Sequence, residues 1–130
     1  MEEEDHYKTC KRYNVSGHSH FLTFSCFKRQ PFLSKDRTCQ WLAKTIISAR
    51  RDFNFRVIAY VFMPEHVHLL LYPNDKIYNI SDILSAIKTP VTRAAKKFVT
   101  ESARDFLPRM LDVQPSGEKG ISFLAAWRRL

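Results

Sequence analysis

The nine residues from Met63 to Leu71 read MPEHVHLLL, and the segment around them decides the fold. Residues 55–63 (FRVIAYVFM) are mostly β-forming, and residues 66–72 (HVHLLLY) make a second run of the same kind. Two such runs joined only by Pro64 and Glu65 predict an antiparallel hairpin. Both runs are nearly continuous in apolar residues, which predicts central strands that are buried on both faces.

A strand and a helix are expected before this hairpin. Residues 18–27 (HSHFLTFSCF) are rich in aromatic residues and Thr, which predicts a strand that ends before Pro31. Asp36 can cap a helix that runs from Arg37 to about Asp52. The apolar stripe of this helix recurs at helical spacing, with Trp41 expected in the core, and consists of Trp41, Leu42, Thr45, Ile46 and Ala49.

A second helix is predicted after the hairpin, from about Ser81 to Ser102, with its N-cap within residues 79–82. Pro90 lies inside this stretch and is expected to kink the helix or to split it in two. One face of the helix is apolar and carries Ile83, Leu84, Ile87, Val91, Ala94, Ala95 and Phe98. Four basic residues are expected off that stripe, namely Lys88, Arg93, Lys96 and Lys97.

Residues 120–124 (GISFL) predict a last strand after a turn at residues 115–117. The predicted order is strand, helix, strand, strand, helix and strand. This order indicates an α+β fold of the ferredoxin-like split β-α-β type, an antiparallel sheet with helices on one face. Residues 1–16 are polar and charged and are expected to form an N-terminal tail, and residues 17–130 are expected to form a single domain.

Composition restricts the class of protein. A chain of 130 residues that is 45% hydrophobic can bury one core. No apolar run approaches the ~20 residues of a membrane span, and the acidic start MEEED is unlike a secretory signal, so we expect a cytoplasmic protein with no membrane partner. The net charge of +8 favours a polyanion such as nucleic acid. The cysteines, at 10, 26 and 39, form no CxxC pair and are expected as packed, reduced thiols.

The pair His66 and His68 is the most informative feature of the sequence. Side chains alternate along a strand, so both imidazoles are expected on one face, about 7 Å apart along the chain, with Val67 on the other. Two such imidazoles can converge on a divalent cation, although strand-end histidines satisfied by hydrogen bonds have the same spacing. The position of the pair, at the start of a central strand in a basic domain, makes a metal site about as well supported as an ordinary pair of histidines.

The motif MPEHVHLLL resembles the Met-Pro-x-His-Val-His-Leu-Leu signature of REP-associated tyrosine transposases and their insertion-sequence relatives, the single-strand DNA transposases with a histidine–hydrophobe–histidine site. Residues 21–29 (FLTFSCFKR) resemble the first strand of the same group. Residues 84–88 (LSAIK) resemble its following helix. The resemblance covers residues 18–98, and its central motif is long and specific.

The resemblance implies cleavage and rejoining of single-stranded DNA next to a hairpin, as in DNA transposition. His66 and His68 would hold Mg²⁺ or Mn²⁺, which polarises the scissile phosphate. A tyrosine hydroxyl on a following helix would attack, leaving a 5′-phosphotyrosine link and a free 3′-OH that permit rejoining without ATP. Phosphate contacts and base stacking are expected from Lys88, Arg93, Lys96, Lys97 and Tyr72.

The nucleophile departs from the family pattern. Many relatives carry Leu-Lys-x-x-Tyr-Thr-Arg in the following helix, whereas residues 87–93 here read IKTPVTR and place Val91 at the tyrosine position. Ala95 stands where some relatives carry a polar third metal ligand. Among the tyrosines of this chain, Tyr78, just before the second predicted helix, is the best candidate nucleophile.

Other residues near these motifs have simpler interpretations. Tyr60 is expected in the core, and Tyr72 at the rim of the sheet. Glu65 could ligate the metal, but we expect it to belong to the turn, with its side chain alternating away from the histidines. His18 and His20 form a second same-face pair on the first strand and are expected to be ordinary strand-end histidines.

The C-terminal residues indicate an incomplete copy. A subgroup of relatives with Ile-Lys-x-Pro-Val in the second helix continues with Phe-Trp-Gln-x-Gly-Gly-Gly-Tyr and a further helical region, whereas residues 123–130 here read FLAAWRRL. Codons for FLAAWRRL exist that, shifted by one base, read Phe-Trp-Gln-His-Gly-Gly-Gly. We therefore expect a frameshift near Phe123, which the nucleotide sequence from the Lys119 codon onward tests.

Three functions remain open from the sequence. The first is enzymatic: metal-dependent cleavage and rejoining of single-stranded DNA in transposition. The alternative is a catalytically dead transposase remnant that only binds hairpin or single-stranded DNA, and the third is a basic α+β domain with an incidental histidine pair. Relatives often pair, so a homodimer is a further expectation.

Overall fold

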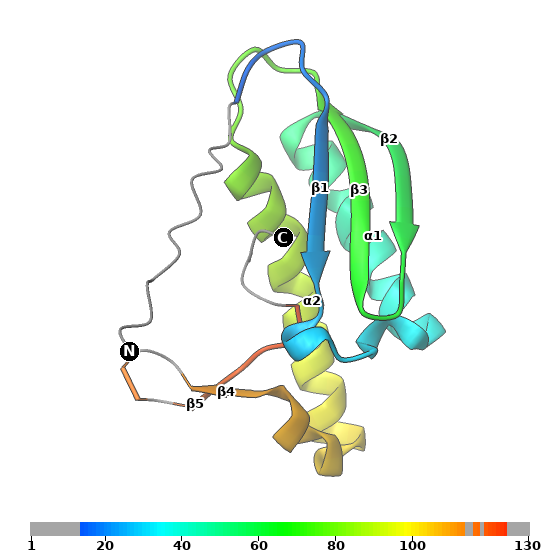
Figure 1. The fold of residues 1–130 in the computed structure, drawn as a ribbon, viewed down its shortest axis with the longest axis vertical. Helices are drawn as coiled ribbons and strands as arrows, with labels where there is room; N and C mark the ends of the chain where they lie inside the picture. Colours follow the sequence, from blue (N-terminus) through cyan, green and yellow to red (C-terminus); the bar gives the residue numbers. More distant parts are fainter. Residues whose placement is uncertain (1–13, 114–115, 118, 125–130) are drawn as a thin grey trace, which may run out of the picture.

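The computed structural model describes residues 14–113, 116–117 and 119–124. Its main sheet has three strands in the order β1-β3-β2, formed by β1 (His20–Ser25), β2 (Phe55–Phe62) and β3 (His66–Pro73). Both outer strands are antiparallel to β3 and therefore parallel to each other, and α1 (Asp36–Phe53) connects them (Figure 1). This is the split β-α-β arrangement, so the predicted α+β fold class is confirmed.

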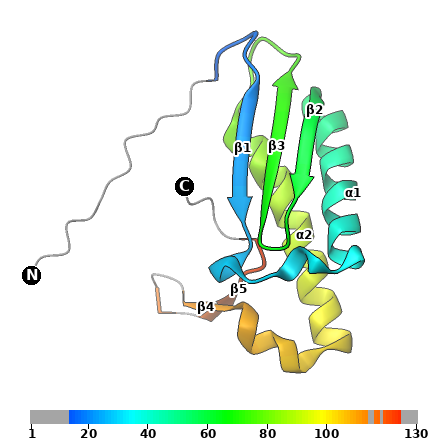
Figure 2. The same ribbon diagram turned by 45° about the vertical axis from the view of Figure 1, so that its right-hand side comes forward.

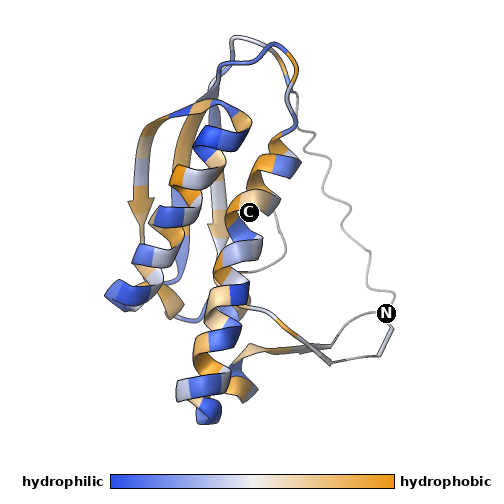
Figure 3. Cartoon of the chain, turned by 180° about the vertical axis from the view of Figure 1, so that it is seen from behind, coloured by the Kyte–Doolittle hydropathy of each residue, from blue (hydrophilic) through white to orange (hydrophobic). Residues whose placement is uncertain are grey.

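The two long helices cover one face of the sheet. α1 and α2 (Ile80–Ser102) lie side by side behind the three strands (Figure 2). Seen from behind, both helices carry hydrophilic residues on their outward sides, as expected of amphipathic helices that bury one stripe (Figure 3). The other face of the sheet is covered by no helix of the described residues and is called the open face below.

Burial alternates along β3 as the pleat requires. Val67, Leu69 and Leu71 are fully buried under the helices, whereas His66 and His68 are only partly buried on the open face. The prediction of strands buried on both faces was wrong, because an antiparallel sheet with helices on one side leaves its other side to solvent.

β2 is an edge strand rather than a central one. Its pairing with β3 shifts register between Val57 and Ala59, an irregularity of the β-bulge kind. Tyr60, which was expected in the core, is 63% exposed, and its ring packs on Phe62 at 5.1 Å between centroids. Tyr60 is exposed because an edge strand has a neighbouring strand on one side only, which leaves its other side open to solvent.

The predicted core stripe of α1 is largely confirmed. Leu42, Ile46 and Ala49 are buried, and Trp41 packs edge-on against Phe98 of α2, at 5.9 Å between ring centroids. The helix begins at Asp36, one residue earlier than predicted, and its N-cap is the residue before, which makes no side-chain cap bond. Asp36 still contributes, since a carboxylate in the first turn complements the helix dipole.

α2 is one continuous helix in spite of its proline. Asn79 caps it by accepting the Ser81 N–H at 2.9 Å, within the predicted segment. Pro90 does not split the helix as predicted. Its side chain is exposed, so the ring avoids the core, and the missing N–H removes only the bond to the carbonyl of Ala86. Lys88, expected off the apolar stripe, is buried, with Nζ 5.2 Å from the centroid of the Phe24 ring.

Short elements close the end of the sheet where β1 finishes. Three are 3₁₀ turns: η1 (Phe27–Arg29), η2 (Phe32–Ser34) and η3 (Arg104–Met110). β4 (Leu111–Val113) and β5 (Lys119–Ile121) form a separate antiparallel ribbon. The last strand predicted at residues 120–124 therefore does not join the main sheet as a strand, and Leu124 makes only an isolated bridge to Cys26.

The predicted tail is described only from Asn14 onward. Asn14 Oδ1 accepts the N–H of Ile80 at 3.1 Å, and the Val15 carbonyl accepts the hydroxyl of Tyr78 at 2.6 Å. These bonds attach residues 14 and 15 to Tyr78 and to the first residue of α2. No helix among the described residues has the length and apolar character needed to cross a membrane.

Candidate metal centre

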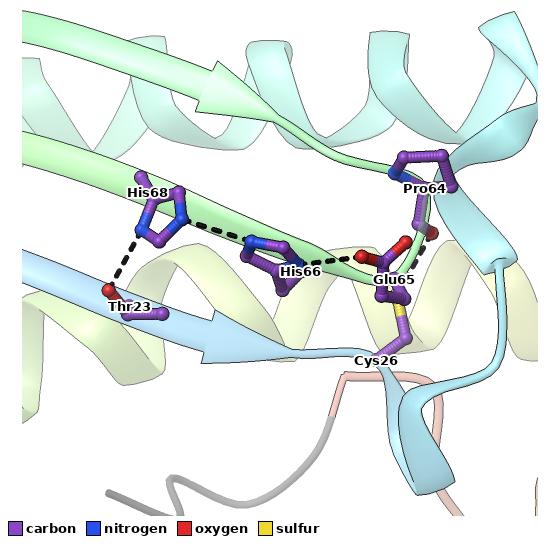
Figure 4. Close-up of polar contacts among 6 residues, drawn as sticks. All are labelled: Thr23, Cys26, Pro64, Glu65, His66 and His68. Carbon is purple, nitrogen blue, oxygen red and sulfur yellow. Dashed lines mark hydrogen bonds and ion pairs between the residues drawn. The ribbon is translucent and has the colours of Figure 1, made fainter. Parts of the chain in front are cut away.

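His66 and His68 lie next to each other on the open face of the sheet (Figure 4). Their Nε2 atoms are 3.0 Å apart, and their ring planes meet at 84° with centroids 4.7 Å apart. The side chain of His66 is 16% exposed, so the pair is sheltered but accessible. Alternation along β3 places both imidazoles on this face, and their rotamers bring the two Nε2 atoms together.

Each imidazole is held through its Nδ1 atom. His66 Nδ1 lies 3.0 Å from Oε1 of Glu65, and His68 Nδ1 lies 3.0 Å from Oγ1 of Thr23. An ionised carboxylate can only accept, so His66 donates its Nδ1–H to Glu65 and keeps a lone pair on Nε2. Metal-binding histidines commonly have such a partner on one nitrogen, which fixes the ring and leaves the other nitrogen for the ion.

The tautomer of His68 determines whether the Nε2 atoms of both histidines have a lone pair available for a metal ion. With His66 Nε2 as acceptor, His68 donates Nε2–H to it and Thr23 donates its hydroxyl to His68 Nδ1. If His68 instead carries its proton on Nδ1, Thr23 Oγ1 accepts it, and both Nε2 lone pairs are free. Two metal–nitrogen bonds of about 2.1 Å at a right angle span about 3.0 Å, so the pair fits two positions of an octahedral ion such as Mg²⁺.

The turn before β3 positions Glu65. The carbonyl of Glu65 accepts the N–H of Cys26 at 2.9 Å, and the carbonyl of Pro64 accepts the N–H of Leu33 at 2.9 Å. The Cys26 thiol also donates to the Pro64 carbonyl, at 3.8 Å (Figure 4). Burial raises the pKa of Cys26 to about 11, so the group stays a thiol and serves as a packed donor.

Two expectations for this region are refined. Glu65 was expected in the turn with its side chain directed away, and it is in the turn, but its carboxylate comes back to His66 Nδ1. Cys26 and Cys39 are free thiols, as expected, whereas Cys10 lies outside the described residues.

Among the described residues, His66 and His68 are the two side chains placed to act together as metal ligands. Within the described ranges, no group of three or more His, Cys, Asp or Glu side chains could hold an ion. Ala95, at the position where some relatives carry a third ligand, is fully buried on α2, beneath the face of the sheet opposite the histidines. A polar residue at position 95 of this chain would therefore not reach the pair.

Tyr78 is not brought to the histidine pair. Its hydroxyl donates to the Val15 carbonyl and lies 2.7 Å from Nε2 of His20, which shares the helix-covered face of β1 with buried Leu22. In the β1–β3 register, His20 is three residues from the partner of His68, or about 10 Å along the strand. Desolvation by burial also raises the pKa of Tyr78, which disfavours the phenolate.

Val91 occupies the core beneath the sheet. The side chain is fully buried on α2, and both long helices cover the face opposite the histidines. A tyrosine at this position would point into the core, away from the metal centre of the same chain. The interpretation of position 91 as the place of a lost nucleophile stays a prediction, and the burial of Val91 in this chain lends it no support.

The basic residues of α2 lie away from the histidines. Arg93, Lys96 and Lys97 are exposed on the helix side of the molecule and line a shallow depression together with Thr100 and Glu101. Tyr72, in contrast, lies in the same row of β3 as the histidines, and the guanidinium of Arg56 sits 4.7 Å from its ring centroid.

Sequence reasoning missed three residues of the open face. Thr23 stands directly opposite His68 in the β1–β3 register, and Phe21 stacks on the His68 ring at 5.5 Å and 15°. Arg56 stands opposite Tyr72. The alternation of β1 could have placed Phe21 and Thr23 on one face, but only the strand register shows which histidine they meet.

Replacing Thr23 by Val is expected to lower the affinity for Mn²⁺ by about tenfold, because His68 loses the acceptor that favours its Nδ1–H tautomer. Valine has nearly the same shape and favours strands, so the fold should persist. Calorimetric titration with Mn²⁺ measures the effect. Thr23→Ser keeps the hydroxyl and should bind Mn²⁺ nearly as the unmodified chain does; equal losses in both variants would contradict the role of the hydroxyl.

The fold and the MPEHVHLLL strand together define the class of protein: a transposase built on a split β-α-β sheet. The family model described as "Transposase IS200 like" matches residues 14–109, which is most of the chain. The chain therefore belongs to the IS200-like transposase family.

Two solved structures are similar to this chain. One is a REP-associated tyrosine transposase bound to a REP hairpin, with 28% identity and a TM-score of 0.58, covering 68% of this chain and 53% of that one. This chain thus spans about half the length of that relative. The other is a protein from Deinococcus radiodurans R1 assigned as a transposase, with 22% identity, a TM-score of 0.55 and coverage of 78% and 74%. No curated protein shows significant similarity.

Proposed function

We propose that this chain forms the metal- and DNA-binding domain of a transposase that cleaves and rejoins single-stranded DNA in the cytoplasm. The geometry of His66 and His68 carries the proposal: their Nε2 atoms converge, and both Nδ1 atoms are held by neighbours. Mg²⁺ or Mn²⁺ is the proposed ion, and when bound it supplies the positive charge that polarises a scissile phosphate.

The open face is the proposed path of the DNA strand. Phe21 is 67% exposed beside His68, and the Tyr72 ring with the Arg56 guanidinium lies further along the same face. Exposed aromatic rings stack unpaired bases, and neighbouring cations hold phosphates. The relative bound to a REP hairpin supports a hairpin next to the single strand as part of the substrate.

The helix side is the proposed contact for additional phosphates. Arg93, Lys96 and Lys97 are exposed there and contribute to the net charge of +8. Lys88, also expected to bind DNA, is left out of the proposal because its side chain is buried. Contacts on both sides of the sheet suit a folded DNA that wraps around the domain rather than one that lies in a single groove.

The nucleophile is proposed to come from outside the described residues. Tyr60 and Tyr78 lie on the helix-covered side of the sheet, and Tyr7 and Tyr13 lie outside the described residues. Tyr72 shares the open face but stands four residues from His68, or about 13 Å along β3, beside Arg56. In the proposed step, the attacking hydroxyl oxygen bonds to phosphorus and the bond to the 3′ oxygen breaks. That oxygen takes up a proton and leaves as a free 3′-OH. A second copy of the chain in a homodimer is one source of the hydroxyl.

The lack of a tyrosine hydroxyl beside the histidines among the described residues favours a second candidate function. In this second function the chain is a remnant that binds hairpin or single-stranded DNA without cutting it. Incubation of the chain with Mn²⁺ and a hairpin oligonucleotide carrying a single-stranded flank separates the two. The enzyme should form an SDS-resistant adduct that His66→Ala abolishes, whereas the remnant should give only salt-sensitive binding. Absence of both adduct and salt-sensitive binding would exclude both functions.

A further inference from the structure

A pocket of about 310 Å³ lies on the helix side of the sheet, apart from the metal centre. It is enclosed by η2, the first turns of α1, the C-terminal half of α2, and η3. Five aromatic side chains line it, and the proposed cleavage chemistry uses none of them: Phe32, Trp41, Phe98, Phe106 and Phe123. These rings belong to the core or pack against it, and they also present their surfaces to the pocket.

The rings of this aromatic pocket brace one another in two groups. Phe32 stacks on Phe123 at 4.9 Å and contacts Phe106 at 5.4 Å, whereas Trp41 meets Phe98 at 5.9 Å. Phe32 and Phe123 are almost fully buried, so their orientations are fixed by the core. The pocket therefore offers flat apolar surfaces that are already ordered in the folded protein. Binding of a ligand would cost little side-chain conformational entropy at these rings.

The rim of the pocket is positively charged. Lys35, Arg37 and Arg109 line it, and no Asp or Glu is among its lining residues. The guanidinium of Arg37 lies 4.0 Å from the Phe98 ring centroid, and that of Arg109 lies 5.3 Å from the Phe106 centroid. A ligand that complements this pocket has a flat apolar part, which fits between the rings, and a negatively charged part, which meets the basic rim.

We propose that the aromatic pocket binds one unpaired nucleobase of a single-stranded DNA, with the flanking phosphates held by Lys35, Arg37 and Arg109. Its volume is at the small end of the range for ligand pockets, which suits one base rather than a larger ligand. Aromatic walls stack a base of any sequence, and the cations bind the backbone on either side. The inference rests on the proposed DNA-binding function and adds a base site that is separate from the metal centre.

A backbone hydrogen bond joins the segment beside the pocket to the turn that precedes β3. Leu33, next to the pocket residue Phe32, donates its N–H to the carbonyl of Pro64 at 2.9 Å, one residue before Glu65, which holds His66. A base seated in the pocket would fix the DNA strand relative to the turn that carries the metal centre. On this proposal, a seated base would limit which phosphates of the strand can approach the histidines.

Trp41 reports directly on the pocket. The chain has two tryptophans, and replacing Trp127 by Phe leaves Trp41 as the one fluorophore of its kind. A short oligothymidylate should quench Trp41 and bind about tenfold tighter than an abasic oligomer of the same length and charge. Arg37→Gln should weaken oligothymidylate binding severalfold, whereas Arg51→Gln, at the exposed far end of α1, should change it little.

The possible results of these measurements distinguish a failure of the base site from a failure of the proposed DNA-binding function. Equal affinity for the two oligomers, with no change in Trp41 emission, would overturn the base site while leaving DNA binding intact. Quenching by thymidine 5′-monophosphate without binding of any oligomer would support the pocket and count against the DNA-binding function. Quenching retained in His66→Ala supports a site independent of the metal centre. The comparison of oligomers uses the unmutated pocket, so it holds even if Arg37→Gln fails to fold.

Discussion

Replacing His68 by Ala is expected to lower the affinity for Mn²⁺ by about a hundredfold or more, because one of two converging imidazole ligands is removed. The remaining ligand, His66, also loses the neighbour whose Nε2 lies 3.0 Å away. Calorimetric titration of the purified chain with MnCl₂ measures the loss, and the spectrum of free Mn²⁺ by electron paramagnetic resonance provides an independent measurement.

The control for this prediction is His18→Ala. His18 is exposed before β1 and belongs to no metal centre of the described residues, so its removal should leave the affinity for Mn²⁺ unchanged. An equal affinity in His68→Ala and the unmodified chain would show that the histidine pair is an ordinary hydrogen-bonded pair of strand residues. Comparable losses in His18→Ala and His68→Ala would show that the ion binds nonspecifically.

Replacing Val91 by Tyr is expected to destabilise the protein by about 3 kcal/mol or more rather than to restore a nucleophile. Val91 is fully buried, so the larger tyrosine ring would overfill the core. Its hydroxyl would also be removed from water without a hydrogen-bond partner prepared for it. Urea unfolding followed by circular dichroism gives the change in the free energy of unfolding. The same variant should form no covalent DNA adduct that depends on residue 91.

Glu101→Tyr is the matched control for that variant. Position 101 is exposed near the end of the same helix, so a tyrosine there should change stability by less than about 0.5 kcal/mol. A Val91→Tyr protein that is as stable as the Glu101→Tyr protein would show that residue 91 faces a space open enough to accept the ring. It would also reopen the interpretation of position 91 as the site of the nucleophile.

Helical spacing and the short Pro64-Glu65 connection were sufficient to predict the architecture. They indicate two amphipathic helices, a hairpin and the split β-α-β order, all of which are present. The sequence patterns could not indicate that β2 lies at an edge of the sheet. Ile58, Tyr60 and Val61 are apolar yet exposed, and nothing in their residue types distinguishes an edge strand from a central one.

The candidate metal centre was only partly predictable, because part of its geometry depends on strand pairing and on rotamers. Alternation places His66 and His68 on one face, since it depends only on the period of a strand. The partners on Nδ1 depend on strand register and on a rotamer: Thr23 meets His68 across β1, and Glu65 bends back to His66. Helical spacing correctly placed Val91 on the buried stripe of α2, but spacing alone does not show which face of the sheet that stripe covers.

The two sides of β3 also determine how this gene can diverge. Val67, Leu69 and Leu71 serve folding, and the interleaved His66 and His68 face the open side. Replacement of a codon affects one set alone, so each set can drift under its own selection. Deletion of a single codon inside the strand would exchange the sets, exposing leucines and burying imidazoles. We therefore expect lineages to diverge here through replacements, with the length of this strand preserved.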